Sequence, residues 1–429
     1  MDRFEYRNGK LFCENVSIED IVEQVGTPVY IYSGNTFVEH YRKIAKAFAG
    51  VEPIICYSVK CNSNIHICRM LAKEGAGFDI VSGGELFRAI QAGGDPSKMV
   101  YAGVGKTDSE INQALDAGIG LFNIESVAEL ENLQRITSER KIVARGALRI
   151  NPDIDPKTHR HTATGKKHSK FGVAIEEAEN IIRKYAKHKF LQLTGVHIHI
   201  GSPINSAEPY IEAITKIIKL INSLRKDGFV IDTFDIGGGF GADYVTNQAP
   251  LAEDYAKEIL PLIADSGFKN IILEPGRSIA ANAGILVARV VYIKESAGKL
   301  FAIVDAGMND LIRPVLYDAF HFIWPVRTEE QYVPKVRSEE SDIDGLKQYD
   351  VVGPICESGD CFAKGRKLPE LKRGDLLAIF SAGAYGFTMS SQYNSRPRVP
   401  EVLVDDKYSK LIRRRETYQD LISSELFDS

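Results

Sequence analysis

The sequence predicts an α/β protein made of a closed (β/α)8 barrel and a mainly β domain. Short strand-like runs alternate with amphipathic stretches from about residue 29 to 280, and roughly eight such units are the number that closes a barrel. After residue 285 the texture changes to strand-like runs punctuated by glycine and proline. An open, doubly wound sheet is the competing interpretation of the alternation; the number of units favours the barrel.

The strand candidates of the first part are short and rich in β-branched and aromatic residues. They are VYIY at 29, PIICYSV at 53, GFDIV at 77, KMVYAG at 98, GLFNIES at 120, ARGALRIN at 144, TGVHIHIG at 194, DTFDIGG at 232 and NIILEPG at 270. The segments between them, such as TFVEHYRKIAKAFAG and AEPYIEAITKIIKLINSLRKDG, carry apolar residues at helical spacing. The helix of EINQALDAG is expected to begin at Thr107, where Glu110 completes a capping box.

These textures predict the domain boundaries. Residues 31–283 are expected to form the barrel, and residues 284–429 the β domain with a C-terminal helix. Residues 1–30 include the hairpin-like FEYRNGKLFCENVSI and are expected to add strands to the β domain. The barrel would then be inserted within the β domain.

Composition narrows the class of protein. A net charge of -4 over 429 residues gives no electrostatic footprint for nucleic acid, and the one basic run, Arg413 to Arg415, adjoins a helix-like pattern. The N-terminus has no apolar signal-like region and no stretch of 18 apolar residues occurs, so a cytoplasmic enzyme is predicted. Six cysteines are expected to be reduced; two C-x4-C pairs allow a zinc interpretation but lack the usual two-residue spacing.

Residues suited to chemistry fall where strands are expected to end, and in a barrel such residues meet at the C-terminal rim. They are Lys60, Asp79, His199 with Gly201 and Ser202, the glycines after Asp235, and Glu274. A lysine at a strand end is most often a solvated surface residue. Lys60 ends the apolar run before CNSN, and the other residues suited to chemistry at the strand ends favour a functional interpretation of this lysine.

Two loops contain further residues suited to chemistry. DIGGGFG places Gly237, Gly238 and Gly239 after a strand, which suits either a phosphate cradle or a tight turn, and it does not fit the dinucleotide motif G-x-G-x-x-G. Glu274 and Arg277 share the loop EPGR, where a local ion pair is the competing interpretation. An amine, a phosphate cradle and a carboxylate together indicate pyridoxal phosphate.

Ten motifs in order along nearly the whole chain resemble the fold type III pyridoxal-phosphate-dependent decarboxylases and, more narrowly, the diaminopimelate decarboxylases. They are YSVKCNSN, GFDIVSGGEL, INPDIDPKTHRHTATGKKHSKFG, GVHIHIGS, DIGGGFG, LEPGRSI, DAGMNDLIRP, GPICESGD, GAYGFTMSSQYNSRPRVPEVLV and LIRRRET. The resemblance implies an alanine-racemase-like barrel with a β domain and pyridoxal 5'-phosphate as cofactor.

The resemblance implies a set of cofactor-binding residues. Lys60 would be the Schiff-base lysine, His199 would stack on the pyridine ring, and Glu274 would pair with the ring nitrogen. The phosphate would be held by Ser202 and the three glycines with help from Tyr385. The remaining members of the set are Asp79, Pro275, Gly276 and Arg277. His197, on the same strand as His199, is interpreted as a core residue.

The resemblance also implies how the substrate binds. Arg277, Arg313 and Tyr317 would clasp its distal carboxylate and Glu357 would meet its ammonium, with Tyr385 nearby. Cys356 would return the proton after carbon dioxide leaves. The segment around Cys356 enters the other subunit's site in this family, so a homodimer with shared active sites is implied. PDIDPKTHRHTATGKKH resembles a mobile loop that covers the site.

The expected reaction is decarboxylation of meso-2,6-diaminopimelate to L-lysine, the last step of lysine biosynthesis. A related decarboxylase of ornithine, arginine or carboxynorspermidine, a non-catalytic regulatory homologue and a racemase are the alternatives. This sequence departs from the family pattern at three positions, where Ser58 and Cys61 replace small alanines and Pro203 replaces glutamine. The departures affect the expected loop geometry and leave the expected reaction unchanged.

Overall fold

The computed structural model describes residues 2–155 and 169–426, which divide into two compact units. The barrel unit comprises His40–Gly241 and Ala249–Ser278, and the β unit comprises Met1–Glu39, Ala242–Gln248 and Ile279–Ser429. Residues 156–168, which form most of the predicted covering loop, lie outside the described residues. Each unit is described by itself.

Eight parallel strands form the barrel. Their order around the ring is β9, β11, β12, β13, β5, β6, β7 and β8, and pairing of β8 with β9 closes the ring. The strands are β5 (Ile54–Ser58), β6 (Gly77–Ile80), β7 (Met99–Tyr101), β8 (Leu121–Ile124), β9 (Ala144–Asn151), β11 (Leu191–His197), β12 (Thr233–Asp235) and β13 (Asn270–Leu273), with the short β10 (Val173–Ala174) beside β9. The predicted barrel is confirmed.

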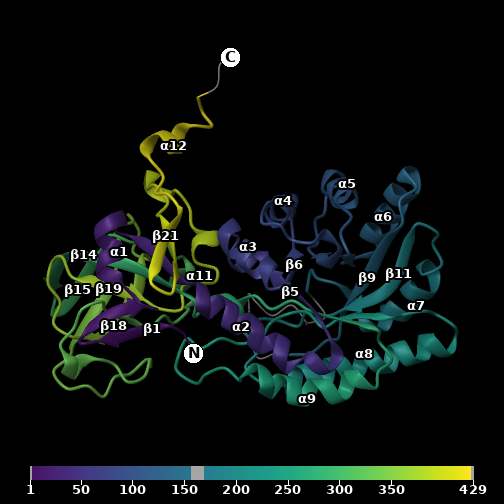
Figure 1. The fold of residues 1–429 in the computed structure, drawn as a ribbon, viewed down its shortest axis with the longest axis horizontal. Coiled ribbons are helices and arrows are strands. Elements are labelled where there is room, and N and C mark those ends of the chain that lie inside the picture. Colours follow the sequence, from purple (N-terminus) through teal and green to yellow (C-terminus); the bar gives the residue numbers. More distant parts are fainter. Residues whose placement is uncertain (1, 156–168, 427–429) are drawn as a thin grey trace. The chain divides into compact units, whose positions relative to one another are not determined.

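Helices lie around the outside of these strands (Figure 1). They are α2 (Gly34–Ala47), α3 (Ile65–Lys73), α4 (Gly83–Gln91), α5 (Asp108–Ala117), α6 (Val127–Arg140), α7 (Ile175–Tyr185), α8 (Glu208–Lys226) and α9 (Ala252–Ala264). The single turn α10 (Arg277–Ala280) follows β13. The capping box predicted at Thr107 and Glu110 is confirmed at the start of α5. A cap of this kind satisfies backbone N–H groups that no helical bond can reach.

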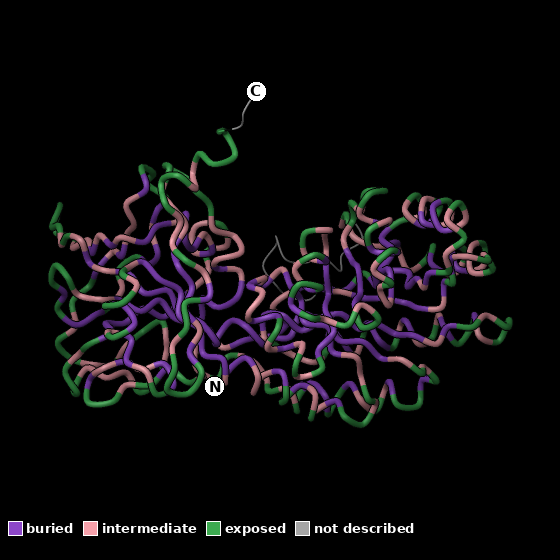
Figure 2. The backbone as a smooth tube through the Cα atoms, turned by 45° about the horizontal axis from the view of Figure 1, so that its top comes forward, coloured by how far each residue is buried: buried purple, intermediate pink, exposed green. Residues whose placement is uncertain are grey.

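The barrel strands are mostly buried, whereas the helices alternate between buried and exposed positions (Figure 2). Strands covered by helices on one face and by the barrel interior on the other have no solvent face, so their sequences read as continuous apolar runs. Part of the core is a cluster of five buried residues from five strands, namely Cys56, Val100, Leu121, Ala147 and Ile272.

The β unit is built on the long strand β14 (Gly284–Ser296), which pairs with β4 (Val29–Ser33), β15 (Lys299–Val304) and β19 (Leu376–Ile379). The rest of the sheet comprises β16 (Ile323–Pro325), β17 (Lys347–Val352), β18 (Cys361–Leu368), β20 (Glu401–Asp405) and β21 (Tyr408–Arg413). A small sheet of β1 (Phe4–Arg7), β2 (Lys10–Cys13) and β3 (Val16–Ser17) belongs to the same unit. The helices are α1 (Ile18–Val25), α11 (Arg313–Tyr317) and α12 (Tyr418–Ile422).

One strand prediction is wrong in its assignment. The run VYIY at 29 is counted among the alternating strands, but β4 pairs antiparallel with β14 and parallel with β20 in the β unit. All five residues of β4 are buried. A continuous buried run is the same in the centre of a mixed sheet and in a barrel, so the sequence pattern does not separate the two cases.

Two further observations concern the cysteines and the helices. All six cysteines are free thiols, and Cys356 is the exposed one. Among the described residues, no helix combines the length and the apolar character needed to cross a membrane.

We predict that Glu401→Ala strongly destabilises the β unit. Glu401 is fully buried; it accepts a hydrogen bond from the Tyr32 hydroxyl at 2.8 Å and pairs with Arg413. Removing the carboxylate leaves the buried Tyr32 hydroxyl without its acceptor and Arg413 without its partner, which costs about 2 kcal/mol of unfolding free energy. Urea denaturation measures the loss. Glu370→Ala, which removes the exposed partner of Lys347, is the matched control, and equal losses in both variants would contradict the prediction.

Candidate active site

Lys60 lies in a 3-10 turn directly after β5, at the C-terminal rim of the barrel. Its Nζ donates to Asp79 Oδ2 at 2.6 Å, and Asp79, on the neighbouring strand β6, is fully buried. Ser58 donates to the same Oδ2 at 2.6 Å and is also 3.1 Å from the carbonyl oxygen of Glu274. Ser58 therefore links the anchor of Lys60 to the loop after β13.

The glycine loop follows β12. Gly237 and Gly239 have φ values of 73° and 104°, in the region that favours glycine. A Cβ on Gly237, Gly238 or Gly239 would lie 2.2, 2.1 or 2.3 Å from a backbone oxygen of a neighbouring loop. The turn itself therefore requires three glycines, so a phosphate is not needed to explain them, and the backbone remains bare toward any ligand.

Glu274 follows β13 and is almost completely buried. Its Oε1 accepts a hydrogen bond from Asn123 Nδ2 at 3.0 Å, and its Oε2 lies 3.4 Å from His197 Nε2 and 3.8 Å from His199 Nδ1. Burial works against ionisation, but His197 and the charge of Lys60 hold the pKa of Glu274 below its usual range. Glu274 is therefore a carboxylate inside the barrel.

His199 is held as a neutral ring. Burial lowers its pKa well below the ordinary value, and the nearby cations of Arg149 and Lys60 act in the same direction. The backbone N–H of Gly238 donates to Nδ1 at 3.2 Å, which places the ring proton on Nε2. The contact ties His199 to the glycine loop.

Ser202 and the loop after Glu274 complete the barrel part of the predicted site. Arg277 begins α10, is buried, and donates from Nε to Ser202 Oγ at 3.0 Å. The carbonyl of Pro275 accepts from Ser58 N at 3.1 Å. A Cβ on Gly276 would lie 2.8 Å from Ser58 Cβ, so the loop packs tightly on the strand that carries Lys60. All barrel residues of the predicted site thus meet at one rim.

The other predicted residues lie in the β unit. Arg313 begins α11; it donates to His321 Nε2 at 2.9 Å, and its guanidinium lies 4.7 Å from the centre of the Tyr244 ring. Tyr317 ends the same helix and is half-buried. Tyr385 has a φ of 55°, a conformation that non-glycine residues seldom adopt.

Cys356 and Glu357 are exposed on the loop GPICESGD. Buried Asp360 holds this loop, because its carboxylate accepts from Ile355 N at 2.7 Å and from Met308 N at 2.6 Å. Cys356 N donates to Asn394 Oδ1 at 3.0 Å. The Tyr393 hydroxyl donates to the Glu357 carboxylate. The thiol and the carboxylate are thus presented by a braced loop at the surface of the β unit.

Sequence reasoning missed part of the rim. Asn123, on β8, touches both Asp235 and Glu274, and His197 contacts Glu274 instead of serving only as a core residue. Each of these residues lies near the C-terminal end of a barrel strand. The rule that identified Lys60 would have found them if it had been applied to every polar residue at a strand end.

The chain matches known proteins along its whole length. The family described as pyridoxal-dependent decarboxylase, pyridoxal binding domain, matches residues 35–281. A diaminopimelate decarboxylase from Pseudomonas aeruginosa is 47% identical over 99% of both chains. Among solved structures, diaminopimelate decarboxylase from Helicobacter pylori complexed with L-lysine is 42% identical, with 95% of this chain and 98% of that one covered and a TM-score of 0.88.

A second solved structure is more distant in sequence. Diaminopimelate decarboxylase from M. jannaschii in co-complex with L-lysine is 36% identical, with 100% of this chain and 98% of that one covered and a TM-score of 0.91. The fold and the matched domain define the class, that of the pyridoxal-dependent decarboxylases. Within this class, the chain belongs to the diaminopimelate decarboxylase family.

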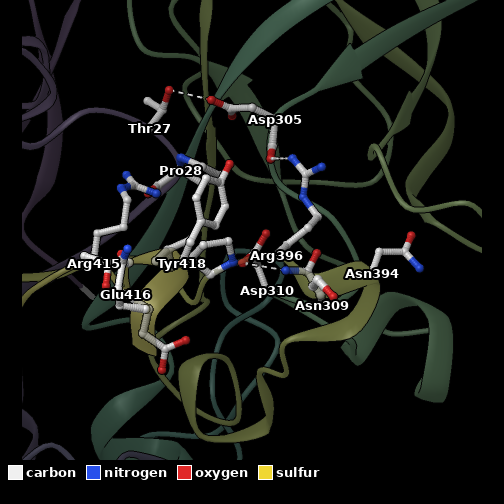
Figure 3. Close-up of a pocket in the computed structure, with 15 residues that line it drawn as sticks. Thr27, Pro28, Asp305, Asn309, Asp310, Asn394, Arg396, Arg415, Glu416 and Tyr418 are labelled. Atoms are coloured by element: carbon white, nitrogen blue, oxygen red, sulfur yellow. Dashed lines mark hydrogen bonds between the residues drawn. The ribbon is translucent and has the colours of Figure 1, made fainter. Parts of the chain in front are cut away.

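The β unit also contains a cavity of about 670 Å³ that none of the predicted site residues lines. Its walls include Asp305, Asp310, Arg396, Arg415 and Tyr418 (Figure 3). Asp305 accepts from Thr27 Oγ1 at 2.6 Å, and Asp310 accepts from Gly307 N at 3.0 Å. Burial raises the pKa of Asp310 to about 7, although the Gly307 N–H and the charge of Arg396 act against the rise.

We predict that Asp310 makes the protein less stable as pH rises. Since its pKa is raised in the folded state, the folded protein binds a proton more tightly than the unfolded chain, and stability falls from the ordinary aspartate range near 3.8 up to about 7. Thermal unfolding of the wild type and Asp310→Asn across this range measures the effect. The advantage of the variant should grow with pH and level off above 7; an advantage independent of pH would contradict the assignment.

Proposed function

We propose that this chain decarboxylates meso-2,6-diaminopimelate to L-lysine, the last step of lysine biosynthesis, with pyridoxal 5'-phosphate as cofactor. The likeness over the whole chain to proteins named diaminopimelate decarboxylase carries the proposal. Two similar solved structures are complexes with L-lysine, the expected product.

The barrel residues fit the cofactor in their chemistry. Lys60 offers an amine that is about one-third exposed, so it is accessible from the rim. Its partner Asp79 keeps Oδ1 buried without a hydrogen-bond partner in the described part of the chain. The glycine loop has no side chain between its backbone and a phosphate, and Glu274 is a buried carboxylate suited to a protonated ring nitrogen.

Each barrel residue then has a defined task. Bound pyridoxal phosphate would supply the electron sink that decarboxylation of an amino acid requires. Lys60 would hold the cofactor through Nζ, Glu274 would keep a proton on the ring nitrogen, and the neutral ring of His199 would lie against the cofactor ring. Ser202 and Gly237 to Gly239 would hold the phosphate, with Asp79, Pro275, Gly276 and Arg277 shaping the same rim. Tyr385, which belongs to the β unit, would add to the phosphate contacts.

The substrate would be recognised through its distal amino-acid centre. Arg277, Arg313 and Tyr317 would bind the distal carboxylate, for which a guanidinium offers parallel hydrogen bonds. Glu357 would bind the distal ammonium, and Cys356 would donate the proton that replaces carbon dioxide. The bracing of Arg313 by His321 and Tyr244 supports the first role, because it fixes the direction of the guanidinium.

A homodimer whose sites are shared and a cytoplasmic location are parts of the same proposal. The exposure of Cys356 and Glu357 on a braced loop supports sharing, since both side chains are available to a second copy of the chain. A related decarboxylase of ornithine, arginine or carboxynorspermidine is less well supported, because its substrate would leave the predicted carboxylate clasp without a partner. A silent regulatory homologue would not need Lys60 and Cys356.

We predict that the cofactor-loaded protein releases carbon dioxide from meso-diaminopimelate and not from L-lysine, L-ornithine or L-arginine. Carbon dioxide release is measured with each substrate separately. Lys60→Ala should abolish the release, because the protein then lacks the amine that would hold the cofactor. Release from ornithine or arginine would contradict the roles of Arg313 and Glu357, and no release from any substrate would favour the regulatory homologue.

We predict that two inactive variants restore activity when mixed. Lys60→Ala and Cys356→Ala damage opposite contributions to a shared site, so a mixed dimer retains one intact site. Random exchange of subunits should therefore recover about a quarter of the wild-type activity. Lys60→Ala mixed with Glu274→Gln is the matched control, because both changes fall on the same barrel. Failure of the first mixture to exceed the control after confirmed exchange would contradict the shared site.

A further inference from the structure

Two buried carboxyl groups lie side by side beneath the rim. Asp235 and Glu274 are at most 2% exposed, and each accepts a hydrogen bond from Asn123 Nδ2, at 2.9 and 3.0 Å. Two adjacent buried carboxyl groups do not both ionise readily, because each charge opposes the other. The environment must select which of them carries the charge.

The residues around the two carboxyl groups favour the negative charge on Glu274. His197 is buried, its Nε2 lies 3.4 Å from Glu274 Oε2, and neither ring nitrogen has a hydrogen-bond partner of good geometry among the described residues. Asp235 accepts the backbone N–H of Gly237 at 2.9 Å, a contact that favours its ionised form. Burial and the charge of Glu274 outweigh this contact and raise the pKa of Asp235 well above its ordinary value.

A divalent metal ion is the rival explanation, because ligand atoms of His197, Asp235 and Glu274 lie within 4.8 Å of one another. Asn123 argues against it. Its amide hydrogens point at both carboxyl groups, where they occupy lone pairs that a metal would need and bring partial positive charge toward the same space.

We propose that Asn123, His197 and Asp235 are positioning residues that keep Glu274 ionised and Asp235 uncharged, so that the negative charge intended for the cofactor ring nitrogen lies on Glu274. Asn123 fixes the orientation of both carboxyl groups, His197 supplies the stabilising ring for Glu274, and Asp235 contributes hydrogen bonds without a second charge. This inference rests on the proposed function, since it assigns the purpose of the cluster to a pyridoxal phosphate ring.

The test measures the protonation state of the cofactor ring nitrogen directly. The full-length protein is loaded with 15N-labelled pyridoxal phosphate, and the 15N chemical shift reports whether the ring nitrogen is protonated. The wild type should show the protonated form and Glu274→Gln the unprotonated form. His197→Phe and Asn123→Leu should shift toward the unprotonated form, and His197→Gln, which keeps a donor, should recover part of the signal. Thr233→Val, a buried polar change on β12 away from Glu274, is the matched control and should keep the protonated form.

A second measurement does not need the cofactor. Infrared spectra of the wild type with 13C-labelled aspartate at about pH 8 should contain an un-ionised carboxyl band that Asp235→Asn removes. At that pH Asp310 is mostly ionised and contributes little to the band.

The outcomes separate the two proposals. A wild type that releases carbon dioxide while His197→Phe and Asn123→Leu keep the protonated ring nitrogen overturns this inference alone. Absence of the un-ionised aspartate band overturns the charge assigned to Asp235, whatever the activity. A wild type that binds no pyridoxal phosphate overturns both the proposed function and the purpose given to the cluster.

Discussion

Pairing of β8 with β9 closes the parallel barrel, and the candidate site depends on that closure. In a closed ring every strand ends at the same rim, so residues far apart in sequence come together without a long connecting loop. The rim collects side chains from six strands or the turns that follow them: Lys60, Asp79, Asn123, His197, Asp235 and Glu274. In an open sheet, β8 and β9 would be unpaired at this point and the ring of contacts would be broken.

Buried charge is the second organising feature of the barrel unit. Asp79, Asp235 and Glu274 are all removed from water, which is unfavourable for a carboxylate unless protein groups replace the solvent. Lys60 and Ser58 do this for Asp79, whereas His197 and Asn123 do it for Glu274. The result is a polar cluster in which the pKa of Asp235 is raised and the pKa of its neighbour Glu274 is lowered. Such divergence is typical of sites that perform chemistry.

In the β unit, neighbouring groups hold Arg313 and the loop of Cys356 in fixed positions. Phe380 O accepts from His321 Nδ1 at 2.8 Å, so the ring proton lies there and Nε2 accepts from Arg313. The guanidinium also covers the face of Tyr244, a favourable contact for a planar cation. Asp360 performs a similar task for the loop that carries Cys356. In both cases a buried group fixes a neighbour and thereby reduces the entropy lost on binding.

The sequence by itself determined the barrel, the capping box at Thr107 and the set of motif residues, because strand runs, helical spacing and caps are local patterns. Only the tertiary structure decided the place of Val29–Ser33 and the involvement of Asn123, His197 and Asp235. A buried run carries no mark of the sheet it joins. The role of a buried polar side chain depends on partners that are distant in sequence, 112 positions apart for Asn123 and Asp235, and only folding brings these together.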